Sequence, residues 1–431
     1  MIPTFQKTEI GEFPSSWEID RVDSAFDIQQ GKQVSSRNRD GEHQRPFLRT
    51  KNVFWNRLEL TDLDEMHFSE AEQTRLELHA NDLLVCEGGS IGRTALWNNE
   101  VEGCLYQNHL HRLRVKGRKA DAQFSVYWLW YAFDVAKLYF GRGNVTTIPN
   151  LSQSKLAELP MALPPLPEQK KIAHILSTVQ RAIEAQERII QTTTELKKAL
   201  MQKLFTEGLR HEPQKQTEIG PVPESWEVKP LIDTVEFIDY GVSQAIPKTE
   251  VPNGVKIVST ADIDKQGNLL YWKIRRIVVP ERTANRLVLK HGDVLFNWRN
   301  SAELIGKTTI FEEQDEPHIF ASFILRICAG EKKSHNYFLK HLMNHYREEG
   351  VFVKLARRAV NQANYNKNEI SVLKIPSPPY EQQVELAQAI GAVDAKIWSH
   401  ADKKRSLEDL FRTLLHELMT AKTRVHELEL S

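Results

Sequence analysis

The sequence predicts a mixed α/β protein with two similar globular heads, each followed by one long amphipathic helix. Three observations lead to this fold class: an internal repeat, two helical heptad patterns, and a proline-rich joint in front of each pattern. A repeat of this size is far longer than a solenoid unit. It indicates a molecule with two equivalent binding parts or approximate two-fold symmetry.

The internal repeat begins near the N-terminus. Thr8-Glu9-Ile10-Gly11, followed by Pro14 and Trp17-Glu18, returns as Thr217-Glu218-Ile219-Gly220, followed by Pro223 and Trp226-Glu227. Further echoes join Asp82-Leu83-Leu84 to Asp293-Val294-Leu295, Gly92-Arg93-Thr94 to Gly306-Lys307-Thr308, and Leu113-Arg114-Val115 to Leu325-Arg326-Ile327. The two copies should therefore share one architecture. We expect Trp17 and Trp226 to act as core anchors, one in each copy.

Each copy contains its own pattern of strands and helices. Short apolar runs at residues 83–85, 111–115, 294–296 and 323–327 are typical of strands, and aromatic-rich stretches at 124–138 and 337–352 are typical of helices. The predicted domains are a first head at residues 1–160, a central spacer helix at 161–210, a second head at 211–376 and a distal spacer helix at 377–431.

Both spacer segments repeat apolar residues at alternating steps of four and three positions, with polar interruptions near the middle. This spacing predicts a coiled-coil seam that packs along a partner helix. At about 1.5 Å per residue, residues 168–206 and 381–420 would form rods of roughly 58 Å and about 60 Å. The seam is expected at Ile172, Leu176, Val179, Ile183, Ile190, Leu200 and Leu204 in the first segment, and at Leu386, Ile390, Val393, Ile397, Leu407, Phe411, Leu414 and Leu418 in the second.

The order of the parts restricts how the helices pair. The first helix has to run from the first head to the second, so a second helix that packs along it has to run back. The sequence therefore predicts two antiparallel coiled-coil helices that join two heads in a pseudo-two-fold arrangement. The joints before the helices are Pro165-Leu166-Pro167-Glu168-Gln169 and Pro378-Pro379-Tyr380-Glu381-Gln382.

The composition excludes several classes of protein. The 57 Lys and Arg residues are balanced by 57 Asp and Glu residues, so any surface that binds nucleic acid has to be a local concentration of charge. The three cysteines form no CxxC pair, which argues against a disulfide framework and a zinc site. We find neither a span of about 18 apolar residues nor a signal-peptide pattern, so a cytoplasmic location without membrane contact is expected.

Two motifs resemble catalytic or ligand-binding signatures only in part. Ser377-Pro378-Pro379-Tyr380 resembles the tetrapeptide with which amino-methyltransferases hold an amine, but it corresponds to Pro164-Pro165-Leu166-Pro167 at the same joint, which favours a structural hinge. The turn from Glu87 to Thr94 is neither GxGxxG nor a Walker loop. We interpret it either as backbone amides and Arg93 near a phosphate or as a plain surface turn. No catalytic residues and no metal ligands are expected.

Basic and amide side chains in the loops of both heads are the candidate contacts to double-stranded DNA. Arg and Lys suit phosphates or guanine, and Asn and Gln suit adenine edges. The alternative for each cluster is a solvated face with turn asparagines. The candidates are Lys32, Arg37, Arg49, Arg93, Gln107, Asn108, Arg112, Arg142 and Asn150 in the first head, and Lys248, Thr260, Asp262, Arg299, Lys307, Arg357, Arg358, Asn361, Gln362 and Asn364 in the second.

Essentially the whole chain resembles the specificity subunit (HsdS) of type I restriction-modification systems. The strongest elements are the joint from Leu163 to Ala173 and the Ile219-Gly220-x-x-Pro-x-Ser-Trp-Glu opening of the second copy. Relative to the first copy, one residue is expected to be lost in the second proline joint and one to be gained after Gln382.

The resemblance implies a division of labour between this chain and its partners. Each head would be a target recognition domain that reads one half of a split DNA sequence, while the helices would act as a ruler and dock two methyltransferase subunits. Restriction and translocation subunits would join later. The chain would bind no cofactor itself, and S-adenosylmethionine, ATP and magnesium would bind to the partner subunits. It would be no enzyme.

The length of the helices is compatible with this role. A rod of about 60 Å corresponds to roughly 17 base pairs at about 3.4 Å each. We expect the two diverged heads to read different half-sites, which gives an asymmetric, interrupted target. A stand-alone DNA methyltransferase or nuclease and a protein-binding scaffold remain the alternatives.

Overall fold

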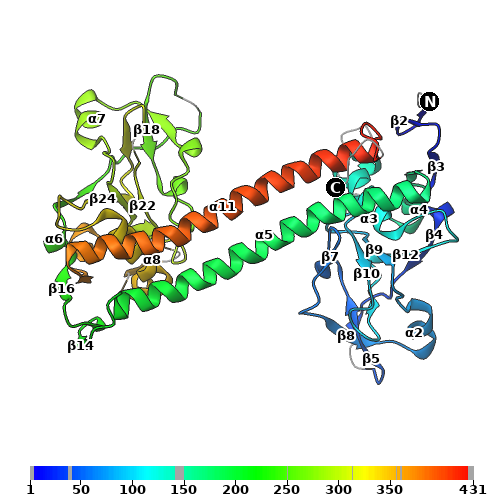
Figure 1. The fold of residues 1–431 in the computed structure, drawn as a ribbon, viewed down its shortest axis with the longest axis horizontal. Helices are drawn as coiled ribbons and strands as arrows, with labels where there is room; N and C mark the ends of the chain where they lie inside the picture. Colours follow the sequence, from blue (N-terminus) through cyan, green and yellow to red (C-terminus); the bar gives the residue numbers. More distant parts are fainter. Residues whose placement is uncertain are drawn as a thin grey trace. The chain divides into compact units, whose positions relative to one another are not determined.

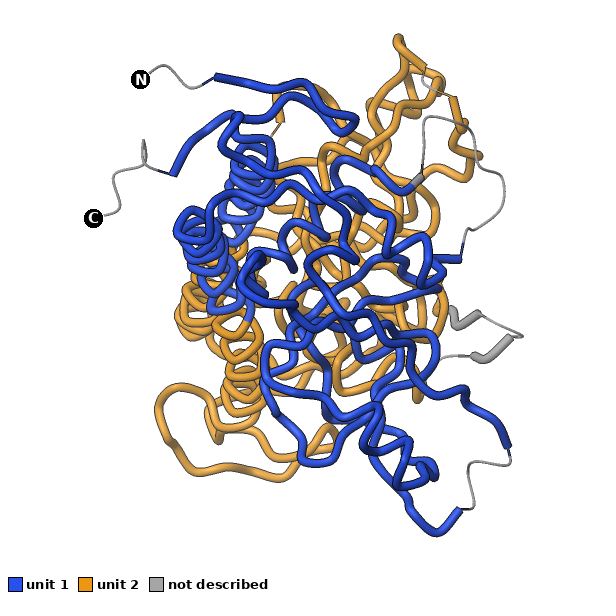
Figure 2. Tube along the Cα trace, turned by 90° about the vertical axis from the view of Figure 1, so that its right-hand side faces the viewer, with its two compact units in different colours: residues 1–187, 402–431 blue, residues 188–401 orange. Residues whose placement is uncertain are grey.

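The computed structural model describes residues 4–36, 41–140, 150–249, 251–312, 314–355, 357–359 and 362–425, with the backbone alone for 140, 355, 357–359 and 362–364. The chain divides into two compact units (Figure 2). Unit 1 comprises residues 1–187 and 402–431, and unit 2 comprises residues 188–401. Each unit contains one predicted head and part of both long helices, so the compact units cut across the predicted domain limits. The prediction of two mixed α/β heads and two long helices is confirmed.

Unit 1 is built around a four-stranded antiparallel sheet in the order β10-β9-β12-β4. Helix α3 packs against β9 and β10 of this sheet (Figure 1). A second sheet, β11-β5-β8, contains the parallel pair β5 and β11. The strands of these sheets are β4 (Phe26–Gln30), β5 (Gln44–Leu48), β8 (Asp64–His67), β9 (Asp82–Cys86), β10 (Thr94–Trp97), β11 (Leu105–Tyr106) and β12 (Leu110–Val115).

Three two-stranded pairs and several short helices complete the first head. The paired strands are β1 (Phe5–Thr8) with β2 (Gly11–Pro14), β3 (Glu18–Arg21) with β13 (Pro160–Leu163), and β6 (Val53–Phe54) with β7 (Arg57–Leu58). The helices are α1 (Val22–Ala25), α2 (Glu70–Leu76), α3 (Ala122–Trp130) and α4 (Gln153–Ala157), with 3-10 turns at Thr50–Asn52 and Leu138–Phe140.

Unit 2 repeats this architecture. Its central sheet has the order β17-β24-β20-β22, and its second sheet has the order β19-β18-β23 with a parallel pair of β18 and β23. The strands are β17 (Phe237–Tyr240), β18 (Val255–Val258), β19 (Arg275–Ile277), β20 (Val294–Asn297), β22 (Thr308–Ile310), β23 (His318–Phe320) and β24 (Ile324–Cys328).

The smaller elements of unit 2 include a three-stranded sheet, β21-β26-β25, most of whose equivalents in the first copy lie outside the described residues. The elements are β14 (Gln214–Thr217), β15 (Gly220–Pro223), β16 (Glu227–Pro230), α6 (Leu231–Thr234), α7 (Glu281–Leu287), β21 (Arg299–Asn300), α8 (Asn336–Glu348), α9 (Val351–Leu355), β25 (Arg357–Ala359), β26 (Gln362–Asn364), α10 (Lys367–Ser371) and β27 (Lys374–Ser377), with 3-10 turns at Thr260–Asp262 and Tyr271–Lys273.

Both predicted aromatic helices are shorter than expected. The predicted helix at 124–138 becomes α3, which ends at Trp130 and continues as a π-helical turn at Tyr131–Val135. The predicted helix at 337–352 is interrupted between α8 and α9 at Gly350, whose φ is +71°. A left-handed residue ends an α-helix, and glycine adopts this conformation without strain.

The strand register corrects the predicted alignment of the two copies. Arg112 lies opposite Leu84 in β9, and Arg326 lies opposite Leu295 in β20. Since Leu84 and Leu295 are equivalent in the repeat, Arg112 is equivalent to Arg326. The predicted match of Leu113-Arg114-Val115 with Leu325-Arg326-Ile327 is therefore wrong by two residues. The turn before β22 is longer than the turn before β10, and the predicted match of Gly92 with Gly306 already allows for this insertion, so the error lies only in the later strands β12 and β24.

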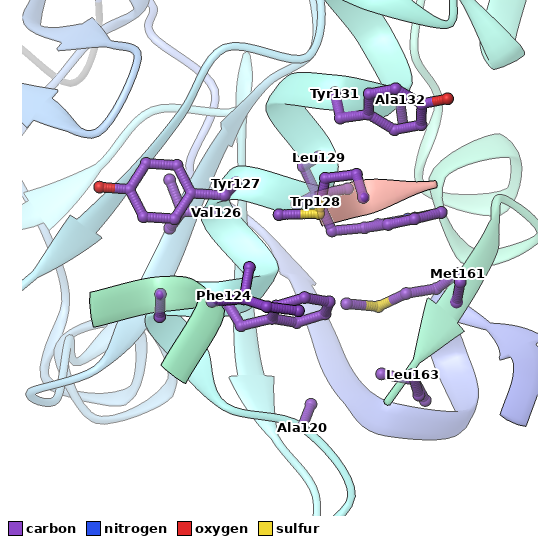
Figure 3. Close-up of a cluster of buried hydrophobic side chains, with 14 of the residues drawn as sticks. Ala120, Phe124, Val126, Tyr127, Trp128, Leu129, Tyr131, Ala132, Met161 and Leu163 are labelled. Atoms are coloured by element: carbon purple, nitrogen blue, oxygen red, sulfur yellow. The ribbon is translucent and has the colours of Figure 1, made fainter. Parts of the chain in front are cut away.

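Each unit has its own hydrophobic core, anchored by the tryptophan of the repeated motif. Trp17 is 2% exposed and Trp226 is 0% exposed, which confirms both as core anchors. The core of unit 1 continues through α3 and β13. Figure 3 shows Phe124 and Trp128 of α3 reaching toward Met161 of β13.

The proline joints connect each head to its long helix through a buried glutamine. Gln169 Nε2 donates to the backbone oxygens of Pro164 at 2.7 Å and Lys119 at 2.9 Å. Gln383 Nε2 donates in the same way to Pro378 at 2.9 Å. Gln169 is thus equivalent to Gln383, and the expected loss of one residue in the second joint and gain of one after Gln382 is wrong. The two joints align without a gap.

The long helices are α5 (Leu166–Glu207), of 42 residues, and α11 (Tyr380–Met419), of 40 residues. In unit 1 they run antiparallel, because Lys404 pairs with Glu187 at 2.8 Å and Arg424, just beyond α11, pairs with Glu168 at 2.9 Å. In the described part of the chain, no helix is long and apolar enough to cross a lipid bilayer.

The helix segments in unit 2 are also antiparallel. Lys197 pairs with Asp394 at 2.6 Å, and Arg210 lies 3.5 Å from Glu385. Every seam residue that we predicted is buried or half-buried. Those near the heads, such as Leu176 and Leu386, join the head cores instead of contacting only the partner helix.

Candidate nucleic-acid interface

Loops that are far apart in the sequence meet at one edge of the central sheet in unit 1, namely the edge formed by the ends of its strands. Strands β4 and β9 end there, at Gln30 and Cys86, and the antiparallel strand β12 begins there at Leu110. His111 lies opposite Gln30, and Leu110 lies opposite Cys86. The sheet therefore gathers the side chains of three loops at this edge.

A buried acid, Glu87, organises the polar side chains at this edge. Its Oε1 accepts a hydrogen bond from Asn150 Nδ2 at 3.1 Å, and its Oε2 accepts one from Gln30 Nε2 at 3.1 Å. Gln30 Nε2 also donates to the backbone oxygen of Asn108 at 3.0 Å, and His109 Nδ1 lies 3.9 Å from Glu87 Oε2. We call these five residues the Glu87 cluster. Glu87 is 7% exposed, whereas Asn150 and His109 are exposed.

The glycine turn after Glu87 is shaped by packing. The amides of Ser90, Gly92 and Arg93 donate to backbone oxygens within the turn, at 2.8, 2.9 and 3.1 Å. A Cβ at Gly92 would lie 2.1 Å from the Phe133 ring, which explains the glycine. Because these three amides are already paired within the chain, they are not free to bind a phosphate, and a phosphate contact by Arg93 or by the other amides of the turn stays a prediction. The plain turn is the better interpretation.

The same edge of unit 2 carries aromatic and basic side chains. Trp298 occupies the place of Glu87, and its Nε1 donates to the backbone oxygen of Ser322 at 2.6 Å. The Arg299 guanidinium lies 4.8 Å from the centre of the Phe323 ring, which is a cation–π distance. Phe323 is 43% exposed. Stacking and cation–π surfaces of this kind suit nucleic-acid bases.

A groove of about 470 Å³ adjoins this edge in unit 2. Its walls combine hydroxyl and amide groups with one guanidinium and one aromatic ring. The lining residues are Ser243, Gln244, Ala245, Ile246, Ser259, Thr260, Arg275, Ala321, Ser322 and Phe323. Arg275 is exposed and anchored by a bond from Nη1 to the backbone oxygen of Pro247 at 2.9 Å.

Several predicted contact residues in unit 1 are buried. Lys32 Nζ donates to Glu72 Oε2 at 2.6 Å and to the backbone oxygen of His67 at 2.7 Å. Arg112 pairs with Asp27 at 2.9 Å and is 5% exposed, and Gln107 is 4% exposed. The prediction that these three side chains contact DNA is wrong, because burial leaves them almost no surface for a ligand.

Two predicted contact residues in unit 2 are also part of the framework. Lys307, 5% exposed, donates from Nζ to the backbone oxygens of Thr260, at 2.8 Å, and Ile263. Asp262 caps its 3-10 turn by accepting from Ser259 N at 2.7 Å and Oγ at 2.8 Å. Burial raises the pKa of Asp262, although both bonds from Ser259 oppose this shift. Neither side chain is available for DNA, so both predictions are wrong.

The remaining predicted residues with described side chains lie at least partly at the surface. Arg49 is exposed but pairs with Asp64 at 2.6 Å, and the Arg93 guanidinium lies 5.3 Å from the centre of the Phe54 ring. The others are Asn108, Asn150, Lys248, Thr260 and Arg299. At the edge described above, the structure brings Asn108 and Asn150 together in the Glu87 cluster.

Some predicted residues lie outside the described residues. These are Arg37, Arg142 and Asn361. The backbone of Arg357, Arg358, Gln362 and Asn364 forms strands β25 and β26, but their side chains are outside the description.

Six residues at the sheet edges were not predicted, namely Gln30, Glu87, His109, Arg275, Trp298 and Phe323. A sequence signal at Asn150, which belongs to the Glu87 cluster, indirectly indicates the positions of Gln30 and Glu87. Asn150 in the first copy and Asn364 in the second each stand two residues before a helix N-cap, at Ser152 and Asn366. A polar residue repeated at such a boundary marks a loop position that both heads share.

Comparison with known proteins adds a family assignment to this geometry. The family described as type I restriction modification DNA specificity domain matches residues 14–194 and 223–409, one match in each copy of the repeat. The MjaVIII type I restriction enzyme specificity subunit of Methanocaldococcus jannaschii is 27% identical over 428 residues, which cover 96% of this chain and 95% of the relative.

Two solved structures share the fold. The S subunit of the type I restriction-modification system from M. genitalium superimposes with a TM-score of 0.58 at 14% identity, over 97% of this chain and 99% of the other. A chain from a study of complex assembly and conformational transition of the type I system gives a TM-score of 0.55 at 14% identity, over 95% and 99% of the two chains.

Proposed function

The chain belongs to the type I restriction modification DNA specificity family, and from this premise we propose that it is the specificity subunit of a type I restriction-modification system. Each head reads one half of a bipartite, asymmetric DNA target. The chain is non-catalytic and supplies the DNA sequence specificity of a methyltransferase and endonuclease complex.

One observation carries the proposal of two different half-sites. The two heads share the order of their central strands but present different side chains at the same edge. Unit 1 presents the Glu87 cluster, whereas unit 2 presents Arg299 and Phe323 beside Trp298. Hydrogen-bonding side chains at base edges determine which base is accepted, so different sets on one scaffold favour different sequences.

We further propose that the long helices dock two methyltransferase subunits and set the gap between the half-sites, with restriction and translocation subunits joining this core. Exposed apolar side chains on the helices support docking, since such surface is uncommon unless a partner covers it. Leu196 is 62% exposed and Trp398 is 55% exposed in unit 2, and Leu410 is 46% exposed in unit 1. S-adenosylmethionine, ATP and magnesium bind to the partner subunits, and the complex works in the cytoplasm.

Sequencing the methylome of a host that expresses the chain with its methyltransferase subunits tests the proposal. The expected result is methylation at one interrupted motif whose two halves differ. Methylation without a bipartite motif would contradict the proposal, and so would methyl transfer by the purified chain alone.

A further inference from the structure

We propose that Glu87 is a positioning residue, which orients the Asn150 amide so that the first head presents it to the edge of an adenine. This inference rests on the proposed function and adds to it the residue pair that selects one base of one half-target.

The hydrogen-bond chemistry of a carboxylate determines which way the amide points. A carboxylate only accepts, and its Oε1 lies 3.1 Å from Asn150 Nδ2, so the amide nitrogen has to face Glu87 and the amide oxygen has to face away. Asn150 retains its second N–H, and within the described ranges its Oδ1 has no hydrogen-bond partner. A donor and an acceptor on one exposed amide are what adenine N7 and N6 require.

Gln30 holds the carboxylate from the other side. Its Nε2 donates both to Glu87 Oε2 at 3.1 Å and to the backbone oxygen of Asn108 at 3.0 Å, so both N–H groups of this amide are used. The carboxylate thus bridges the end of β4 and the loop before α4. Restricting Glu87 in this way also restricts Asn150, whose own side chain is exposed.

Stability alone does not account for a charge at this position. Burying a carboxylate is unfavourable unless a cation compensates it, and the two close partners of Glu87 are neutral amides. Among the residues that the structure describes, the nearest group that can become cationic is His109, with Nδ1 at 3.9 Å. A negative charge also repels DNA phosphates. Both disadvantages are expected to be tolerated only where the carboxylate has a specific task.

The second copy of the repeat shows that the backbone does not need this acid. Leu151 N donates to the Glu87 backbone oxygen at 3.0 Å, and Tyr365 N donates to the Trp298 backbone oxygen at 3.0 Å. The same main-chain bond therefore forms around a tryptophan. What Glu87 adds in unit 1 is the pair of side-chain bonds to Gln30 and Asn150.

Methylome sequencing of the complete complex with substituted full-length chains tests the proposal. In the wild-type complex, we expect the preference for one A·T pair of one half-target to depend on Asn150. Glu87→Gln can donate as well as accept, so it permits both orientations of the Asn150 amide. We expect this variant to keep the other motif positions and to lose roughly 10-fold or more of its preference at that pair.

Two further variants separate positioning from a structural role. Asn150→Ala is expected to relax the same pair, and adding Glu87→Gln to Asn150→Ala should change nothing more, because Glu87 acts through Asn150. The matched control is Glu59→Gln, which makes the same chemical change at an exposed carboxylate of unit 1 and should leave the motif unchanged.

Three outcomes would overturn the inference. The first is that Glu87→Gln slows methylation at all sequences equally while the motif stays the same, which indicates a structural role. The second is that the two single variants relax different positions. The third outcome applies if the Glu87→Gln variant does not fold. The test is then Asn150→Ala, which changes an exposed side chain, and an unchanged methylation motif in this variant overturns the inference. A wild-type complex without any bipartite motif would instead contradict the proposed function itself.

Discussion

Replacing Gln169 by alanine should destabilise unit 1 more than the equivalent change at Gln383 destabilises unit 2. Gln169 is 0% exposed and makes three hydrogen bonds, from Nε2 to the oxygens of Pro164 at 2.7 Å and Lys119 at 2.9 Å, and from Asp121 N to Oε1 at 2.7 Å. The substitution leaves one buried and one part-buried carbonyl group and one part-buried amide without their partners, and each such loss costs about 1 to 3 kcal/mol.

The expected loss for Gln169→Ala is therefore about 3 to 5 kcal/mol. In a unit of about 200 residues, this corresponds to a decrease of roughly 10 °C in the melting midpoint. Gln383 makes two such bonds, to Pro378 O at 2.9 Å and from His335 N at 2.8 Å, so Gln383→Ala should cost about 2 to 3 kcal/mol.

Differential scanning calorimetry of the full chain measures both effects. Gln202→Ala is the matched control, because Gln202 is an exposed glutamine on the same helix as Gln169. The reasoning is refuted if Gln169→Ala melts at the same temperature as the control, or if Gln383→Ala lowers the midpoint more than Gln169→Ala does.

Three further predictions follow from the second head and the helices. Arg299→Ala removes the guanidinium beside Phe323. Methylome sequencing should therefore find a weaker sequence preference in the half-target that the second head reads, which is not the half-target that Asn150 reads; an unchanged motif would argue against base contact by Arg299. Burial, with Lys340 and Lys197 nearby, holds the pKa of His341 well below 6.5, although Asp394 lies 3.8 Å away. Below pH 6.5 the histidine thus binds more protons in the unfolded chain than in the folded chain. The melting temperature should therefore fall as the pH is lowered from about 7.5 to about 5.5, and it should fall less steeply in His341→Gln; equal slopes for the two proteins would contradict this. One extra heptad in each helix adds roughly 10 Å, so the gap between methylated half-sites should grow by about three base pairs, and a constant gap would count against the ruler.

The long helices and the core anchors could be predicted because their signals are local and repeated. A heptad pattern over some forty residues identifies the buried face of a helix without knowledge of its partner. Trp17 and Trp226 are large apolar residues in a repeated motif, and both are buried. The register of β12 with β24 was predicted incorrectly by two residues, although Gly92 was matched correctly with Gly306, because a shift of two residues leaves the alternation of side chains along a strand unchanged.

The candidate contacts were harder to predict, because a basic side chain has the same sequence signature whether it is exposed or paired inside the fold. Lys32 pairs with Glu72, which is 40 residues away in the sequence, and Arg112 pairs with Asp27, which is 85 residues away in the sequence. These distant pairings turn both predicted DNA contacts into parts of the framework. The acidic Glu87 was not selected, because a buried acid is not an expected feature of a DNA-binding edge.

The sequence by itself determined that this protein contains the same head and helix twice, because hydrophobic periodicity and repeated motifs act over short stretches of chain. Only the tertiary structure decided which side chains reach the edge of each sheet. That selection depends on which strands become neighbours and which charges neutralise one another, as Arg112 with Asp27 shows. Both are long-range choices, made when the strands pair and bury what lies between them.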